Sequence, residues 1–380
     1  MLWIMLFSYP LMVGIQEISG QIGRVTGRGI AGNLRRFYSP WLLYSIVFLL
    51  FIANTINLGA DIGAMGASVS LLCGGPAVLF AAVFGVGSLA LQAFMSYEKY
   101  AGVLKWLCAS LFAYVATVFV VHVPWATALR HTLIPTLQWK GAEIVAIVAV
   151  LGTTISPYLF FWQAGEEVEI EEANPKEQPL TKAPEQAPSQ LHRIRVDTAT
   201  GMAFSNIVSF FIILTAAAAL NRHGITDIST ATQAANALRP VAGKFAFVLF
   251  AMGIIGTGLL AVPVLAGSAA YAVGEAMHWK VGLSNDVMKA KRFYAILALA
   301  TVLGVVLNFA HINMIKALFW TAVINGLVAV PIMILMMLMA NNRKVMRQFT
   351  LTRRLNILGW LATLVMAAAA VGLVATWNQQ

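Results

Sequence analysis

The chain has 380 residues, of which 59% are hydrophobic and only 11% are charged. A mean hydropathy of +0.79 excludes an ordinary soluble domain. The formal net charge of +10 does not require a nucleic-acid partner, because most of the 25 basic residues fall in loops on one side of the predicted membrane spans. This positive-inside bias predicts a multi-pass protein of a bacterial inner or plasma membrane, with the lipid bilayer as its surroundings.

About ten apolar stretches are long enough to cross a bilayer, which takes about 20 helical residues. They cover roughly 2–23, 41–70, 76–97, 101–121, 142–163, 199–220, 245–274, 293–310, 316–340 and 355–377. The pattern predicts an all-α polytopic membrane protein. The charge bias places Met1 outside the membrane, and the chain starts within an apolar stretch, so we expect one further helix before Met1.

The first two stretches each contain one acid well inside the membrane, Glu17 and Asp61. An ionisable side chain at that depth is costly and indicates a functional site or a structural ion pair. Glu17, next to Gln16, lies close enough to Arg24 and Arg28 to pair with either. Asp61 follows Asn57 by one helical turn, so these two form a polar helix face. We expect Gln16, Glu17, Asn57 and Asp61 to line a gate or polar pathway.

The fifth stretch, 142–163, carries a proline late in the sequence Gly152-Thr-Thr-Ile-Ser-Pro-Tyr-Leu-Phe-Phe-Trp-Gln163. Pro157 lacks an amide hydrogen and clashes with the carbonyl four residues earlier, so it predicts a helix break. Within lipid, the freed carbonyls need a partner, a cavity or an ion. Transporters place substrate sites at such interrupted helices, so this stretch is interpreted as half of a binding site.

The polar segment 164–197 follows the break and contains seven glutamates, five of them within 166–172, and four prolines. This composition predicts a flexible cytoplasmic linker. In the ninth stretch, Asn325-Gly326 precedes Pro331. The amide of a buried Asn suits a cation or an interhelical hydrogen bond equally well.

These motifs together resemble those of Nramp-type divalent metal transporters. Residues Pro10 to Ala31 are similar to the second helix of that family, and Ala53 to Gly66 resemble its third. Gly256–Pro263 and Asn325–Pro331 fit its eighth and tenth helices. The resemblance covers nearly the whole chain and implies an inverted-repeat, LeuT/APC-like transporter fold, with about ten of eleven expected helices present.

The resemblance also implies a division of this single transmembrane domain. Residues 1–121 are then the remainder of the first repeat, 142–163 the broken helix, 164–197 the linker, 199–340 the rest of the second repeat and 355–377 an extra C-terminal helix. The family's first helix carries an Asp-Pro-Gly motif that this sequence lacks. The expected helix before Met1 would supply it.

The family usually has Met-Pro-His where this chain has Ser156-Pro157-Tyr158. Methionine is a soft ligand, and its replacement by a hydroxyl favours a hard cation such as Mg²⁺. At these positions the chain is similar to the Nramp-related magnesium transporter branch. The loss of the histidine also removes an obvious proton acceptor. We expect Thr153, Ser156, Tyr158 and Asn325 to face the ion.

The resulting hypothesis is alternating-access transport of Mg²⁺, or of Mn²⁺, without proton coupling. The divalent ion is cargo, and no cofactor or obligate protein partner is indicated. Three alternatives stay open: a proton-coupled Mn²⁺/Fe²⁺ transporter of the same family, an amino-acid or other organic-solute transporter of the same fold, and an incomplete, non-transporting membrane fragment. The spans contain no enzyme-like ligand cluster, nucleophile elbow or phosphate loop, so an enzyme is not expected.

Overall fold

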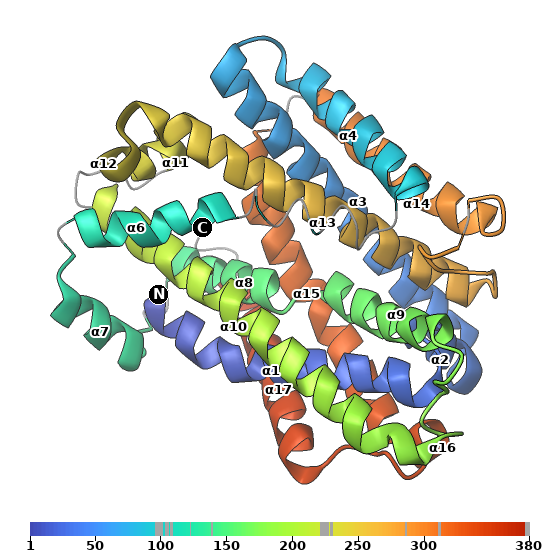
Figure 1. The fold of residues 1–380 in the computed structure, drawn as a ribbon. Coiled ribbons are helices and arrows are strands. Elements are labelled where there is room, and N and C mark those ends of the chain that lie inside the picture. Colours follow the sequence, from blue (N-terminus) through green and yellow to red (C-terminus); the bar gives the residue numbers. More distant parts are fainter. Residues whose placement is uncertain are drawn as a thin grey trace.

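The computed structural model describes residues 1–95, 102, 106, 109–121, 123–137, 140–220, 228, 231–285, 287–310 and 313–376. Every regular element in these ranges is a helix, as the composition predicts (Figure 1). The helices of at least eight residues are α1 (Leu2–Thr26), α2 (Ile30–Phe37), α3 (Pro40–Cys73), α4 (Ala77–Phe94), α6 (Phe112–Val120), α7 (Trp125–Leu133), α8 (Gly141–Thr154), α9 (Pro157–Ala173), α10 (Ala187–Ala219), α13 (Ala246–Ala276), α14 (Lys291–Leu307), α15 (Met314–Ala340) and α17 (Arg353–Ala375). Three shorter helices are α11 (Ala231–Ala235), α12 (Arg239–Ala242) and α16 (Arg343–Met346).

Within the described residues, nine helical segments are long and apolar enough to cross a membrane, with α8 and α9 together forming one of them. They match nine of the predicted stretches. The remaining prediction, 101–121, lies partly outside the described residues. Its described part includes only a shorter apolar helical stretch, Ala109–Val120.

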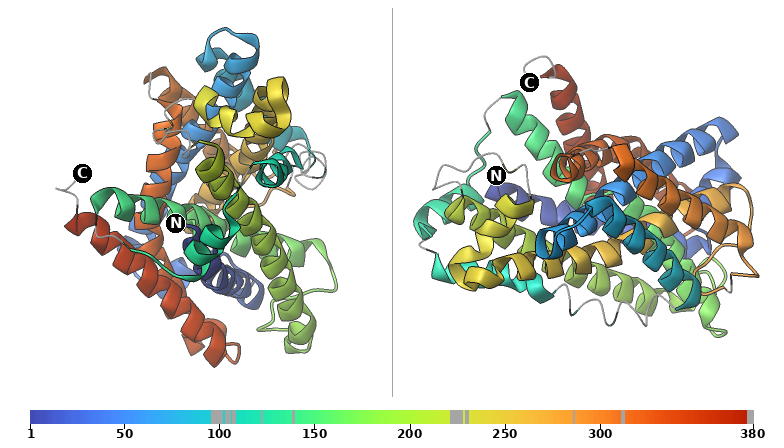
Figure 2. Two further views of the ribbon diagram at one scale, coloured as in Figure 1. Left: turned by 90° about the vertical axis from the view of Figure 1, so that its left-hand side faces the viewer. Right: turned by 90° about the horizontal axis from the view of Figure 1, so that it is seen from above.

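The helices pack into two groups on either side of α8, α9 and α15 (Figures 1 and 2). In one group, α3 packs against α4, α13 and α14. In the other, α1 packs against α10 and α17. The central helices touch both groups, because α15 contacts α3 as well as α17, and α9 contacts α13 as well as α1. The interrupted segment therefore lies where the two groups meet.

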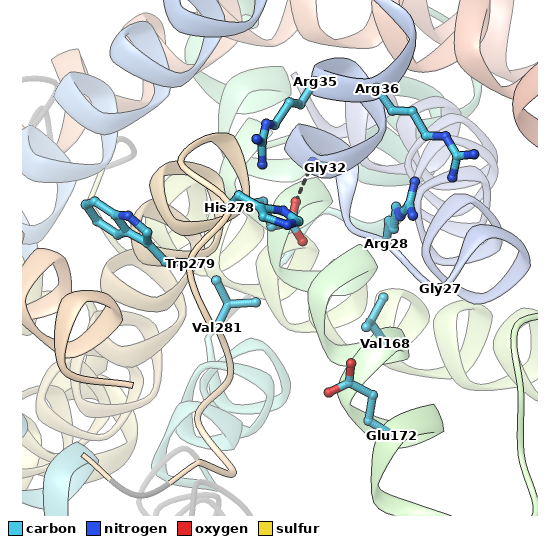
Figure 3. A pocket seen from close by; sticks show the side chains of 11 residues that line it. Gly27, Arg28, Gly32, Arg35, Arg36, Val168, Glu172, His278, Trp279 and Val281 are labelled. Atoms are coloured by element: carbon cyan, nitrogen blue, oxygen red, sulfur yellow. Dashed lines mark hydrogen bonds between the residues drawn. The ribbon is translucent and has the colours of Figure 1, made fainter. Parts of the chain in front are cut away.

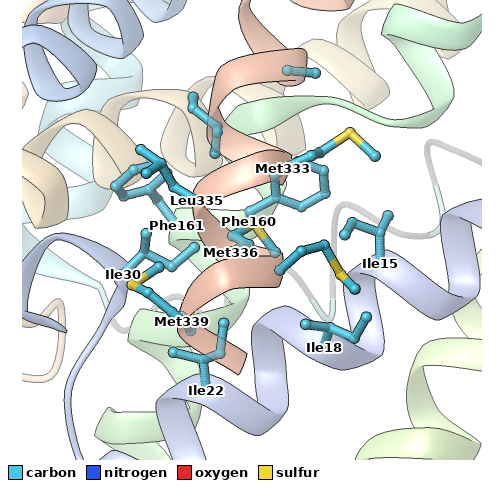
Figure 4. Packing of buried hydrophobic residues seen from close by; sticks show 14 of the residues in the cluster. Ile15, Ile18, Ile22, Ile30, Phe160, Phe161, Met333, Leu335, Met336 and Met339 are labelled. Atoms are coloured by element: carbon cyan, nitrogen blue, oxygen red, sulfur yellow. The ribbon is translucent and has the colours of Figure 1, made fainter. Parts of the chain in front are cut away.

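The largest apolar core joins α1, α9 and α15 (Figure 4). Ile15, Ile18 and Ile22 repeat at helical spacing along α1, and they pack with Phe160 of α9 and Met336 of α15. All five side chains are at most 1% exposed. Large apolar side chains in close contact fix the helices through many small dispersion terms, which is how helices associate within lipid.

Small residues let α1 approach α9 closely. A Cβ atom at Gly23 would lie 2.3 Å from the carbonyl oxygen of Ala164. The Ser19 hydroxyl donates to the carbonyl of Phe160 at 2.5 Å. The polar end of α1 is thus held directly on the backbone of α9.

The segment 164–197 is not a flexible linker, and that prediction is wrong. Helix α9 continues to Ala173, and α10 begins at Ala187. Between them, the amides of Leu180 and Thr181 donate to the carbonyls of Arg24 and Val25 at 3.2 and 3.1 Å. Composition favoured disorder here, but long-range partners for the glutamates and for the backbone order the segment.

Candidate functional site

The helix break lies at the predicted place. Helix α8 ends at Thr154, Ser156 has an extended backbone (φ −89°, ψ 134°), and Pro157 is the first residue of α9. A proline is well tolerated there, because the first turn of a helix needs no amide donor. Pro263 and Pro331, in contrast, lie inside continuous helices. Of these three prolines, only Pro157 lies where the chain leaves the helical path and resumes it.

The Ser156 hydroxyl satisfies the carbonyls freed by the break. It donates towards the carbonyl oxygens of Gly152 at 2.6 Å and Thr153 at 3.0 Å, and the residue is only 1% exposed. The hydroxyl proton is therefore used within the chain, while the lone pairs of its oxygen stay available to an electropositive partner. The Thr153 hydroxyl donates to the carbonyl of Ala149 at 2.9 Å, and its residue is exposed on α8.

Asn325 is brought to the break by two glycines. A Cβ atom at Gly152 would lie 2.0 Å from the carbonyl oxygen of Ala322 and 2.5 Å from the amide nitrogen of Gly326. Helices α8 and α15 are thus in backbone contact immediately beside Asn325. This close approach is the structural reason for a glycine at both positions, and the sequence analysis did not identify it.

Asn325 and Asn57 form a reciprocal amide pair between α15 and α3. Asn57 Nδ2 donates to Asn325 Oδ1 at 2.8 Å, and Asn325 Nδ2 donates back to Asn57 Oδ1 at 3.3 Å. Asn57 also donates to the carbonyl of Ala53 at 2.9 Å. The sequence placed Asn57 in a polar pathway and Asn325 at the ion, whereas the structure places both in one pair.

Asp61 and Tyr158 complete the polar group around the break. Tyr158, the second residue of α9, lies close enough to Asp61 for its hydroxyl to feel the charge of that carboxyl group, and it lies two residues after Ser156. Asp61 lies one helical turn beyond Asn57 on α3 and is half-buried. Serine, tyrosine, asparagine and aspartate side chains from three helices thus gather near one point, and all of them offer oxygen atoms.

Gln16 and Glu17 contact other parts of the chain near α9 and α10. Gln16 Nε2 donates to the carbonyl of Leu159 at 3.0 Å, so it holds the first turn of α9. Glu17, only 4% exposed, accepts hydrogen bonds from Gln21 and from Arg195 Nε, both at 3.1 Å.

The expected pairing of Glu17 with Arg24 or Arg28 is therefore wrong. Arg24 is fully buried and pairs with Glu177 at 2.5 Å, because the segment after α9 folds back onto the end of α1. Arg195 lies 178 residues from Glu17 in sequence, which is why local spacing did not reveal it.

The site chemistry is that of hard oxygen donors. No group of three or more His, Cys, Asp or Glu side chains that could hold a metal ion occurs among the described residues. Hydroxyl, amide and carboxylate oxygens suit Mg²⁺, Ca²⁺ or Mn²⁺ better than softer metals. Asp61 is the acid of this group, and the other side chains offer neutral hydroxyl and amide oxygens, so an incoming cation would retain water molecules and rely on few direct protein ligands.

Comparison with known proteins gives one family. The model described as "Natural resistance-associated macrophage protein-like", Nramp, matches residues 1–376. A "Divalent metal cation transporter MntH" of Acidiphilium cryptum is 26% identical over 356 residues, covering 90% of this chain and 75% of the relative. Another of that name, from Verminephrobacter eiseniae, is 26% identical over 264 residues, covering 68% of this chain. The match spans 57% of the length of that second relative.

Solved structures confirm the predicted fold class. A mutant of the Eremococcus coleocola manganese transporter superposes with a TM-score of 0.75 at 16% identity, covering all of this chain and 80% of the other. MhsT in complex with L-phenylalanine gives 0.61 at 13% identity, covering 97% of this chain and 90% of the other. At such identities the likeness concerns the fold alone, which is the LeuT-like transporter architecture.

Proposed function

The chain belongs to the Nramp family, and on that premise we propose that it carries a divalent metal cation across the membrane. It is a multi-pass membrane protein and not an enzyme. The observation that carries the proposal is the interrupted α8–α9 segment, where Ser156, Tyr158 and Asp61 gather beside Asn325. Interrupted helices at the centre of a transporter are where ions and substrates bind.

The relatives favour manganese as the cargo more than the magnesium that the sequence suggested. The relatives are named as divalent metal cation transporters, and one of the two solved structures with this fold is that of a manganese transporter. We therefore take Mn²⁺ as the first candidate. Mg²⁺ is the second, on the specific observation that the buried hydroxyl of Ser156 precedes the proline where a thioether would favour softer metals.

The geometry supports alternating access. Helices α8 and α9 are separate helices joined at Ile155 and Ser156. A small change in the backbone angles of these two residues can therefore reorient one helix without breaking the backbone hydrogen bonds within it. Helix α8 is held on α15 through Gly152, and α9 on α1 through Ser19. Motion of one helix group against the other would change access to the ion while its oxygen ligands stay close.

The membrane potential supplies a driving force of about 2.3 kcal/mol per charge for each 100 mV. A divalent ion moving inwards therefore gains about twice that amount. Proton coupling is not required by this energy balance.

The test is uptake of Mn²⁺ into liposomes that contain the purified chain and a metal-sensitive dye, with Mg²⁺ as competitor. We expect saturable Mn²⁺ uptake. Ser156→Met should increase the preference for Mn²⁺ over Mg²⁺, while Ser189→Met, at an exposed position of α10, should leave it unchanged. A pH-sensitive dye in the same vesicles reports proton movement.

Absence of flux for every divalent cation tested, from protein that remains folded and monodisperse, would overturn the proposal. Binding or uptake of an amino acid without metal flux would support the organic-solute alternative instead. If Ser156→Met and Ser189→Met behave alike, Ser156 does not contact the ion.

A further inference from the structure

A second polar site lies away from the helix break, where α1, α2, α9 and α13 meet. It is a cavity of about 500 Å³, which is within the usual range for small-molecule sites. The lining is dominated by Arg28, Arg35, Arg36, His278 and Trp279, with Glu172 and Glu275 as its two acids. Figure 3 shows the three arginines on the side of the cavity formed by α2 and the turn before it, with Trp279 on the opposite side.

Among the described residues, these three arginines have no carboxylate partner. None of the ion pairs found among the described residues includes Arg28, Arg35 or Arg36. Partial burial and the nearby Arg36 cation lower the pKa of Arg28. Figure 3 shows the side chains of Arg28 and Arg36 extending towards one another. Two like charges in such a position repel each other, and an anion placed between them would turn that repulsion into attraction.

The acid nearest to α2 is already in use. Glu275 accepts hydrogen bonds from the backbone amides of Gly29 at 3.0 Å and Gly32 at 2.8 Å. Gly29 is needed for this contact, because a Cβ atom there would lie 2.0 Å from a carboxylate oxygen of Glu275. The glutamate therefore fixes the start of α2, and so the direction of its arginines, instead of neutralising them. Glu172 is exposed at the far edge.

The positive charge continues into two adjoining cavities of about 70 and 350 Å³. The smaller one shares Arg28 and Arg36 with the main cavity, and the larger one shares His278 and Trp279. The charged side chains that these two cavities add among the described residues are all basic: Lys280, Lys289, Lys291, Arg292, Lys344 and Arg347. The three cavities together form one basic surface at the same end of the helices.

This surface lies at the water-facing ends of the membrane helices. Helix α1 ends at Thr26 and α13 at Ala276, while α3 begins at Pro40. Trp41, in the first turn of α3, is 85% exposed. The guanidinium of Arg292 lies 5.4 Å from the centre of the Trp279 ring. Tryptophans next to basic residues are typical of the lipid headgroup region.

We propose that the cavity between Arg28, Arg35 and Arg36 binds the phosphate group of an anionic ligand, either the headgroup of an acidic phospholipid or a soluble phosphate compound. Arginine suits this ligand because its planar guanidinium forms paired hydrogen bonds with phosphate oxygens. The site stands apart from the helix break and does not depend on which ion the protein carries.

The test compares the wild-type chain, purified in a neutral detergent, with the double variant Arg28→Gln/Arg36→Gln. The matched control is Arg353→Gln/Arg354→Gln, which removes two adjacent exposed arginines at the start of α17. Native mass spectrometry counts bound phosphatidylglycerol against phosphatidylcholine, and thermal unfolding measures stabilisation by phosphatidylglycerol and by inorganic pyrophosphate. An ionic strength of about 0.15 M limits unspecific surface attraction to about 8 Å.

For the wild type and the control we expect specific binding, and for the cavity variant an affinity lower by about tenfold or more, because the variant loses two cations that would form charge-assisted hydrogen bonds with the phosphate oxygens. Stabilisation by phosphatidylglycerol alone identifies a lipid site, and stabilisation by pyrophosphate identifies a soluble ligand. If the double variant does not fold, the single exposed change Arg35→Gln takes its place. Equal binding by all variants, or binding of neither probe, overturns the proposal.

Discussion

Replacement of Gly152 by alanine tests whether the contact between α8 and α15 sets the geometry of the site. The added methyl group would lie 2.0 Å from the carbonyl oxygen of Ala322, 2.5 Å from the amide nitrogen of Gly326 and 2.9 Å from its Cα. All three atoms belong to the backbone of α15, so no side-chain rotation relieves the clash. The two helices must move apart by about 1 Å or more to restore ordinary contact distances.

Overpacking of this kind usually costs about 1–3 kcal/mol of folding free energy. The change also separates the break from Asn325, and a displacement of about 1 Å in a preorganised site can reduce its activity by about 10²-fold. We therefore expect Gly152→Ala to lower both the thermal stability and the rate of metal uptake, with the larger relative effect on uptake.

The matched control is Gly201→Ala in α10. Gly201 lies within a helix, and a Cβ atom there would meet nothing within 4 Å. Alanine is the better helix former by about 1 kcal/mol, so this variant should be as stable as the wild type or slightly more stable. Thermal unfolding in detergent and uptake in liposomes are measured for both variants. If Gly152→Ala behaves like Gly201→Ala in both assays, the close helix contact does not position the site.

Three further predictions concern other contacts of the structure. Asn57→Leu and Asn325→Leu should each lower the free energy of unfolding. In the double variant the loss should be smaller than the sum of the two single losses by about 1 kcal/mol, which a double-mutant cycle followed by thermal unfolding measures. Strictly additive losses would contradict the amide pair. Arg193→Ala should lower the free energy of unfolding by about 1–3 kcal/mol, because the carboxylate of Glu167, only 2% exposed, then lacks its partner at 2.5 Å. Adding Glu167→Gln should restore part of this stability, because the amide carries no charge. Mn²⁺ at about 100 times its dissociation constant should stabilise the wild type by about 2.7 kcal/mol, and a chelator should reverse this; an unchanged melting temperature would argue against a cation site in the folded state.

The sequence was most informative where a feature depends on neighbouring residues. Spans of about 20 apolar residues and a proline next to a serine are local patterns, so the helices and the break at Pro157 could be predicted. The location of Asn325 near the break followed only from the family resemblance.

Sequence reasoning failed where distant contacts decide the structure. The segment 164–197 has the composition of a flexible linker, yet Glu169 accepts hydrogen bonds from the amides of Leu283 and Ser284 at 2.6 and 3.0 Å. Tyr271 donates to the same carboxylate. Composition reports the tendency of a segment on its own, and it contains no information about a loop more than a hundred residues away that needs an acceptor.

The choice of metal is the other point that local reasoning did not resolve. Replacement of a soft ligand by the Ser156 hydroxyl argues for Mg²⁺, while the names of the relatives argue for Mn²⁺. Selectivity is a difference between two affinities, and one ligand contributes only part of it.

The central claim is that the helix break and Asn325 together form a cation site. Titration of the purified chain with Mn²⁺, followed by the loss of the electron paramagnetic resonance signal of free Mn²⁺, measures this directly. We expect one saturable class of site that is weakened in Asn325→Ala and unchanged in Asn356→Ala, whose side chain accepts a hydrogen bond from Asn341 at 2.8 Å on the surface. Equal binding by both variants, or no saturable binding by the wild type, would contradict the claim.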